Sequence, residues 1–273
     1  MEIMRLFLLL FLIIPFNLHA QLADSTTRVV KMEGAVNFRD IGNYKTLDNK
    51  TIVKGKIFRS ASIASLTDKD MQKMDGLKIR TVVDFRGTNE AASAPDRLLP
   101  NTDYILCPAG SDSLPTSKEI AEMIKSNDFL MDMYNEKSIQ YYGKRYKPLF
   151  QKLLNIPDEE SLLFHCTGGR DRTGMAAALL LYVLNVPMPV IEEDFTASNI
   201  YLKAANAHMY KPLADMSGTS VTEIENKMKL RPQHIRQFFS TIKSHYGSVE
   251  NFLEKECGIG PEEIIRLRER YSN

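Results

Sequence analysis

The sequence has almost no excess charge and few of the residues that interrupt a folded core. Lys and Arg together number 35 and Asp and Glu 34 among 273 residues, so the net charge is +1. Such a chain has no general field to attract nucleic acid or an anionic membrane, and any anion binding must be local. With only 12 prolines and 14 glycines, and 44% apolar residues, disordered and collagen-like chains are excluded. One domain with a sizeable core is expected.

Cysteine is also scarce. Cys107, Cys166 and Cys257 lie far apart, with no CxxC pair and no metal-ligand spacing. Zinc is therefore disfavoured. No cofactor is expected. In an oxidising compartment Cys107 and Cys257 could pair and leave Cys166 free, or both could be buried apolar thiols.

The N-terminus carries a short apolar run. Arg5 precedes Leu6 to Leu18, and Leu18-His19-Ala20 before Gln21 forms a plausible cleavage site. The run is shorter than the ~18 residues that a membrane-spanning helix usually needs. We expect a signal peptide over 1–20, a mature domain over 21–273, and an exported protein, periplasmic or secreted, with no stable membrane insertion. An uncleaved anchor is the alternative.

Hydrophobic patterning predicts an α/β fold, a central sheet flanked by helices with a helical C-terminal third. Strands are expected within Thr51–Ser62 around Gly55, at Ile79–Gly87 and at Ser161–His165. Residues 111–136 are polar and helix-prone, either a mobile cover over a site or a surface helix. Other helices are expected over 68–75, 138–155, 173–185 and several segments from Val190 to Tyr271, punctuated by Pro212, Pro232, Gly247 and Pro261.

One short segment concentrates residues that carry chemistry. "FHCTGGRDRTG" (Phe164–Gly174) places a loop with Gly168 and Gly169 between a strand and a buried helix. Such a loop aims backbone N–H groups at one point, which suits an anion. Arg172 can grip two phosphate oxygens at once, and the same positive field favours the thiolate of Cys166.

These residues predict phosphoryl transfer through a phosphocysteine intermediate. Asp171 and Asp84 compete for the role of general acid, although Asp84 could instead pair with Arg86. His165 is expected to orient the loop and tune Cys166 without touching the substrate. The phosphate-binding residues would be Thr167, Gly168, Gly169, Arg170 and Thr173, with Thr173 also placed to hydrogen-bond the released thiolate.

The segment resembles the cysteine-dependent protein tyrosine phosphatase superfamily, whose motif is HCxxGxxR followed by Ser or Thr. More closely, the chain resembles the bacterial tyrosine-phosphatase-like family that includes secreted dual-specificity and phosphoinositide phosphatases. The likeness extends over nearly the whole mature chain, through "NFRDIGNY", "GKIFRSASIASLT", "RTVVDFRGTNE", "YGSVENFL" and "GIGPEEIIRLRERY". It implies the phosphatase α/β fold, no metal, Cys166 as nucleophile, Arg172 as phosphate clamp and Asp171 as the proton-transfer residue.

The loop departs from its commonest form in the family, Ala-Gly-Lys-Asp-Arg. Here it is Gly168-Gly169-Arg170-Asp171-Arg172, and a guanidinium forks where an ammonium is a point charge. The expected substrates are phosphotyrosine, phosphoserine or phosphothreonine proteins, or phosphoinositides and inositol phosphates. The alternatives are a non-catalytic module that binds phosphate or phosphoinositide, and a sulfur-transfer enzyme.

Overall fold

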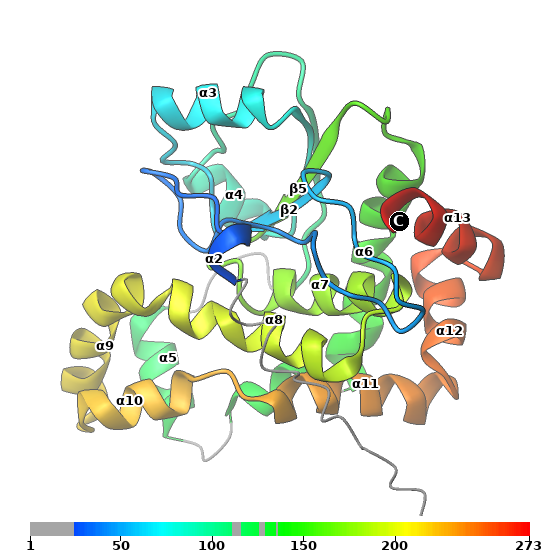
Figure 1. The fold of residues 1–273 in the computed structure, drawn as a ribbon. Helices are drawn as coiled ribbons and strands as arrows, with labels where there is room; N and C mark the ends of the chain where they lie inside the picture. Colours follow the sequence, from blue (N-terminus) through cyan, green and yellow to red (C-terminus); the bar gives the residue numbers. More distant parts are fainter. Residues whose placement is uncertain (1–24, 111–115, 126–128, 135) are drawn as a thin grey trace, which may run out of the picture.

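The computed structural model describes residues 25–110, 116–125, 129–134 and 136–273, so the expected signal peptide over 1–20 lies outside the described residues. Five described strands form one sheet in the order β1-β2-β5-β3-β4, and Figure 1 shows the neighbouring strands β2 and β5. β1 is antiparallel to β2, and all other neighbours are parallel. The strands are β1 (Arg39–Asp40), β2 (Ile57–Ser60), β3 (Ile79–Asp84), β4 (Asp103–Leu106) and β5 (Ser161–His165). The predicted strands are therefore confirmed.

The sheet is covered on both faces, as expected for parallel strands. On one face α6 (Glu136–Asn155) and α7 (Arg172–Val183) bury the larger core, and on the other α3 (Asp68–Gly76) closes a smaller one. Successive strand residues point to opposite faces. The larger core takes Ile57, Leu162 and Phe164, and the smaller takes Phe58, Val82 and Leu163.

The four parallel strands end at one level. Ser60 pairs with His165, His165 with Asp84, and Asp84 with Leu106. The segments that follow these strands therefore meet at one edge of the sheet, which is where open α/β sheets place their ligands.

The C-terminal third is helical, as predicted. It comprises α8 (Met188–Tyr201), α9 (Lys203–Ser217), α10 (Val221–Met228), α11 (Pro232–Tyr246), α12 (Val249–Phe252), a π-helical turn (Leu253–Cys257) and α13 (Pro261–Tyr271). Pro232 and Pro261 begin helices, and Gly247 ends one at φ 79°. The expectation that Pro212 separates two helices is wrong, because it lies inside α9. Its ring is exposed on the outer side of that helix.

Three helices form a satellite unit beside the main core, defined as α5 (Ser117–Ile124), α9 and α10. They share their own buried apolar cluster and lie together at one side of the molecule, away from α13 (Figure 1). The predicted helical character of 111–136 is thus confirmed in α5, followed by a 3-10 helix, Phe129–Tyr134. Residues 111–115 of that prediction lie outside the described residues. Within the described ranges, no helix is both long and apolar enough to cross a membrane.

Helix α3 begins with the capping box that the sequence predicts. Thr67 accepts a hydrogen bond from the Asp70 backbone N–H, and the Asp70 carboxylate accepts from that of Thr67. The same buried carboxylate also accepts from the N–H groups of Glu33 and Gly34, each at 2.8 Å. Burial alone would raise the pKa of Asp70, but the backbone hydrogen bonds outweigh it and hold the pKa below its ordinary value.

Asp70→Ala should lower the free energy of unfolding by about 3 kcal/mol, because three backbone N–H groups lose their acceptor. Since the folded-state pKa of Asp70 is lowered, this contribution is complete above the ordinary pKa of 3.8. It is lost as the pH falls through the folded value. Denaturant unfolding at pH 7 and at lower pH would measure both effects. Asp75→Ala, which removes an exposed partner of Arg80, should cost less than about 1 kcal/mol; equal losses for the two variants would contradict the argument.

Candidate active site

The cysteine loop leaves the sheet at the carboxyl edge. β5 ends at His165, Cys166 follows, and α7 begins at Arg172. Cys166 is buried, with 3% of its surface exposed. The loop therefore lies at the N-terminal end of a twelve-residue helix, whose dipole favours negative charge at this point.

The carbonyls of residues 167–169 are held from outside the loop. The backbone N–H of Ser62 donates to the Thr167 carbonyl at 2.9 Å. The Asn37 side-chain amide donates to the carbonyls of Gly168 and Gly169 at 3.1 and 2.9 Å. Arg59 Nη2 also donates to the Gly169 carbonyl, at 2.9 Å. In a trans peptide the C=O and the following N–H point in opposite directions. The N–H groups of residues 168–170 are therefore turned inward. None of the three donates to another group in the described part of the chain, so they form an anion-binding cup.

A buried charge network beneath the cup fixes the residues that hold these carbonyls. Asp194 of α8 accepts from Arg39 Nε at 3.1 Å, Arg59 Nη1 at 2.5 Å and the Tyr44 hydroxyl at 3.1 Å. Burial would raise the pKa of Asp194, but the two guanidinium groups outweigh it and lower that pKa. Burial, with Arg39 nearby, lowers the pKa of Arg59 to about 10, so Arg59 remains charged at neutral pH. Two cations against one anion leave a net positive charge under the loop.

The two loop glycines are not equivalent. Gly169 has a φ of 59°, and a Cβ there would lie 2.1 Å from the Ser60 carbonyl oxygen. Gly168 meets nothing closer than 3.7 Å, the Cβ of Arg170. Position 168 therefore has room for either glycine, as here, or the alanine that is commonest in the family, whereas position 169 requires glycine.

Arg172 is held at the rim of the cup by Glu90 of α4 (Thr88–Ser93). Two parallel hydrogen bonds of 2.8 and 2.9 Å join its Nη1 and Nη2 to the Glu90 carboxylate, and Nη1 also donates to the Phe85 carbonyl. Burial opposes the charge of Arg172, but Cys166 and Glu90 outweigh it and raise the pKa of the guanidinium. A guanidinium has five N–H donors, so Nε and the second Nη2 hydrogen are left for two phosphate oxygens.

The predicted acid, Asp171, stands at the end of the loop. Its Oδ2 accepts from Arg170 Nε at 2.9 Å, while its buried Oδ1 has no hydrogen-bond partner among the described residues. Arg170 Nη1 also donates to the Met228 carbonyl of α10 at 3.2 Å. The Arg170 guanidinium therefore braces Asp171 against the satellite unit, and its backbone N–H is the group that faces the cup.

Two loop hydroxyls are buried without a hydrogen-bond partner in the described ranges, those of Thr167 and Thr173. An unbonded buried hydroxyl is costly unless it serves a bound group. This suits Thr173, which follows the arginine and was expected to stabilise the Cys166 thiolate.

The thiols of Cys107 and Cys257 are buried and unbonded to each other, so the suggested disulfide is not formed. Burial raises the pKa of Cys107 to about 11 and raises that of Cys257 further.

Asp84 and His165 lie behind the cup and are fully buried. Asp84 accepts from Arg86 Nε and Nη2 at 2.9 and 2.7 Å and from the Tyr104 hydroxyl at 2.9 Å. This is the structural pairing that the sequence left open as the alternative to a catalytic role. Atoms of Asp84, Asp96 and His165 lie within 4.8 Å of one another, as a metal site would need. However, Arg86 contacts both carboxylates, so a guanidinium already occupies the place of a cation.

Sequence reasoning gave no role to six of the residues that hold the loop or Cys166 and its partners: Asn37, Arg39, Arg59, Glu90, Asp96 and Asp194. Glu90 and Asn37 stand within the stretches "RTVVDFRGTNE" and "NFRDIGNY", which offered a signal. Asp194 and Asp96 carried none.

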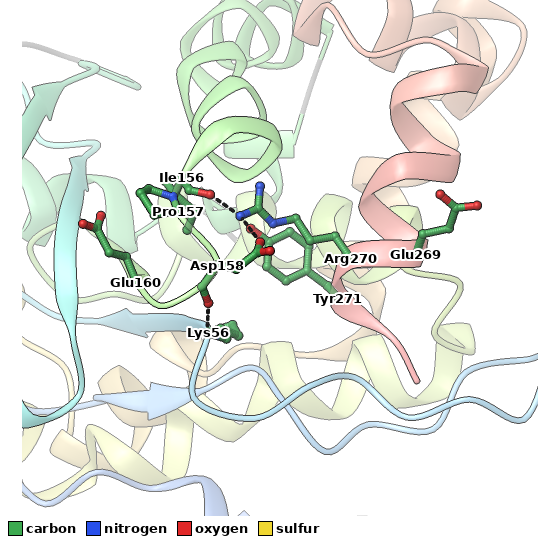
Figure 2. Close-up of a pocket in the computed structure, with 8 residues that line it drawn as sticks. All are labelled: Lys56, Ile156, Pro157, Asp158, Glu160, Glu269, Arg270 and Tyr271. Carbon is green, nitrogen blue, oxygen red and sulfur yellow. Dashed lines mark hydrogen bonds and ion pairs between the residues drawn. The ribbon is translucent and has the colours of Figure 1, made fainter.

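A separate cavity of about 300 Å³ lies at the opposite, amino edge of the strands, where Lys56 precedes β2 and Glu160 precedes β5 (Figure 2). Its Arg270 and Lys56 are bound to carbonyl groups of the chain, and it is remote from Cys166.

The fold and the loop together define an α/β protein with a cysteine thiol at the base of an anion-binding cup. A model described as the tyrosine phosphatase family matches residues 30–273. The chain therefore belongs to the tyrosine phosphatase family and is a phosphoric monoester hydrolase of that family.

Two tyrosine phosphatases of known sequence match this chain over most of their own length. A Cupriavidus necator protein assigned as a tyrosine-protein phosphatase is 26% identical over 242 residues, covering 86% of this chain and 85% of its own. The triple specificity protein phosphatase PtpB of Mycobacterium tuberculosis is 24% identical over 274 residues, covering 88% and 98%. The crystal structure of P. aeruginosa TpbA is 17% identical, covering 68% of this chain and 95% of that one, with a TM-score of 0.30.

Gly169→Ala should abolish turnover, because its Cβ overlaps the Ser60 backbone and φ is left-handed. Gly168→Ala changes the same loop by the same methyl group and should stay within about threefold of the wild type, since nothing blocks that methyl group. The measurement is phosphate release from an aryl phosphate, with thermal unfolding to follow folding. A fully active Gly169→Ala variant would refute the loop geometry.

Proposed function

We propose that the mature chain is an exported phosphatase that hydrolyses phosphomonoesters through a phosphocysteine intermediate on Cys166. The observation that supports it is the cup itself. Three inward N–H groups, the helix N-terminus and the open edge of Arg172 converge above one buried thiol. Preorganised donors of this kind stabilise the charge that develops on the equatorial oxygens of phosphorus.

In the first step the Cys166 thiolate attacks phosphorus and the bond to the leaving oxygen breaks. Asp171, protonated, gives its proton to that oxygen, so the alcohol leaves neutral and a phosphocysteine remains. In the second step Asp171, now a carboxylate, takes a proton from water as the water oxygen attacks phosphorus. The P–S bond breaks, and Thr173 donates a hydrogen bond to the released thiolate. Asp84, tied to Arg86, is assigned a structural role.

Phosphotyrosine is the substrate that we propose first, with phosphoserine, phosphothreonine and phosphoinositides as further classes. The family supports the first, and the name of the M. tuberculosis relative, triple specificity, supports a wider range. The sequence suggested that Arg170 adds a cation for polyanionic substrates. Its guanidinium is engaged by Asp171 and Met228, which weakens the case for phosphoinositides over phosphoproteins.

Residues 21–273 should release phosphate in the presence of chelator from at least one of four probes: aryl phosphate, phosphotyrosine peptide, phosphoserine peptide and phosphoinositide vesicles. Cys166→Ser should remove turnover, because the thiolate is the nucleophile. Asp171→Asn should lower kcat about 10²- to 10⁴-fold. Cys107→Ala, which removes a thiol that stays protonated, should remain active. Phosphate binding without turnover on any probe would instead favour the non-catalytic module, and release of sulfite from thiosulfate would favour sulfur transfer.

Export predicts a cleaved N-terminus. The full chain expressed in a bacterial host should be recovered outside the cytoplasm and should begin at about Gln21, as N-terminal sequencing would show. Replacing Leu9 and Leu10 with arginine should keep it in the cytoplasm at full length. A wild-type chain that stays in the membrane fraction with Met1 intact would favour the anchor instead.

A further inference from the structure

Four charged or chargeable side chains form a buried group directly behind Cys166, here called the histidine cluster: Asp84, Arg86, Asp96 and His165. Their side chains are at most 1% exposed. Arg86 Nη2 lies 2.7 Å from Asp84 Oδ2 and 2.8 Å from Asp96 Oδ1. His165 Nε2 lies 2.9 Å from Asp96 Oδ2 and 3.9 Å from Asp84 Oδ1.

The two carboxylates of this cluster carry one more charge than the Arg86 guanidinium, and a proton on His165 would balance it. Two carboxylates face one guanidinium, and the other groups that touch them are neutral: the Tyr104 and Ser62 hydroxyls and the Ala94 carbonyl. An uncompensated charge without water is strongly unfavourable. Burial would raise the pKa of Asp84, but His165 and Arg86 outweigh it and keep that pKa below its ordinary value.

The ring geometry suits the same state. His165 Nδ1 lies 3.3 Å from the Cys166 carbonyl oxygen, while Nε2 faces Asp96. Nε2 lies 2.9 Å from Asp96 Oδ2 without forming a hydrogen bond, so this contact is an ion pair. An imidazolium would supply its positive charge and could also donate from Nδ1 to the Cys166 carbonyl. A proton on His165 would place a positive charge in the residue that precedes Cys166.

We propose that Asp96 is a positioning residue for the nucleophile: it holds His165 as an imidazolium, and that cation stabilises the Cys166 thiolate. Asp96 touches neither the thiol nor the substrate in this role. The inference rests on the proposed function, because it concerns Cys166 as a nucleophile. Neither Asp96 nor its segment, the loop after α4, stands out in the sequence.

The test is the pH dependence of alkylation of Cys166 by iodoacetamide, with Cys166→Ser as the blank. The midpoint of the wild type should lie well below that of an ordinary thiol at about 8.5. In Asp96→Asn it should rise by about one pH unit, which slows alkylation about tenfold on the acidic side. The sign is diagnostic. Removing a carboxylate while His165 stayed charged would lower the midpoint, whereas loss of the imidazolium raises it.

His165→Gln should raise the midpoint to a similar extent, and Asp96→Asn added to it should raise it no further, since the two act through one cation. Asp103→Asn, which removes a half-exposed partner of Lys152, is the matched control and should leave the midpoint unchanged. A folded Asp96→Asn variant with an unchanged or lowered midpoint would overturn the proposal. So would an equal further rise in the double variant.

A measurement on the wild type decides the matter even if Asp96→Asn does not fold. Long-range ¹H–¹⁵N spectra distinguish imidazolium from neutral imidazole, and His165→Gln identifies the signal among the five histidines. A neutral His165 at pH 6 would overturn the proposal. Turnover distinguishes failure of this inference from failure of the proposed function. If the wild type is active and Asp96→Asn leaves the midpoint of Cys166 alkylation unchanged, only the role of Asp96 is refuted. An inactive wild type with an ordinary thiol titration refutes the proposed function as well.

Discussion

The cup depends on one buried ion network, in which Asp194 holds Arg39 and Arg59. Breaking such a network by removing one partner leaves an uncompensated buried charge, which is strongly unfavourable. The network therefore imposes one geometry, and Asn37, bonded to Arg39, and Arg59 carry that geometry to the loop carbonyls. Because a peptide is planar, holding the carbonyls outside the loop orients the N–H groups within it.

Two further ion pairs flank this network. Glu90 orients Arg172 from α4, and the histidine cluster lies behind Cys166 at the ends of β3 and β5. Each brings residues from separate segments to the level where the parallel strands end. The carboxyl edge of the sheet thus brings carboxylates together with guanidinium groups, and the Cys166 thiol lies there at the N-terminal end of α7.

Much of the fold and the centre of the site could be predicted from the sequence. The apolar run from Ser161, the two glycines and the apolar helix from Thr173 describe strand, loop and helix by local propensity alone. The Thr67 and Asp70 capping box is likewise local. Pro212 was wrongly expected to end a helix. A proline inside a helix removes one hydrogen bond, and the burial of Tyr210, Leu213 and Ala214 in the satellite unit offsets that loss in α9.

By itself, the sequence determined the strand, loop and helix around Cys166 and singled out Cys166 and Arg172 as the proposed nucleophile and clamp, because those features depend on residues close together along the chain. Only the tertiary structure decided which partners they meet. Glu90 lies 82 residues from Arg172, and Asp194 lies 135 from Arg59, so their contacts depend on the crossover connections and the registry of the sheet. Likewise Arg170, a free cation in the sequence, became the brace of Asp171, since its environment is set by packing against α10.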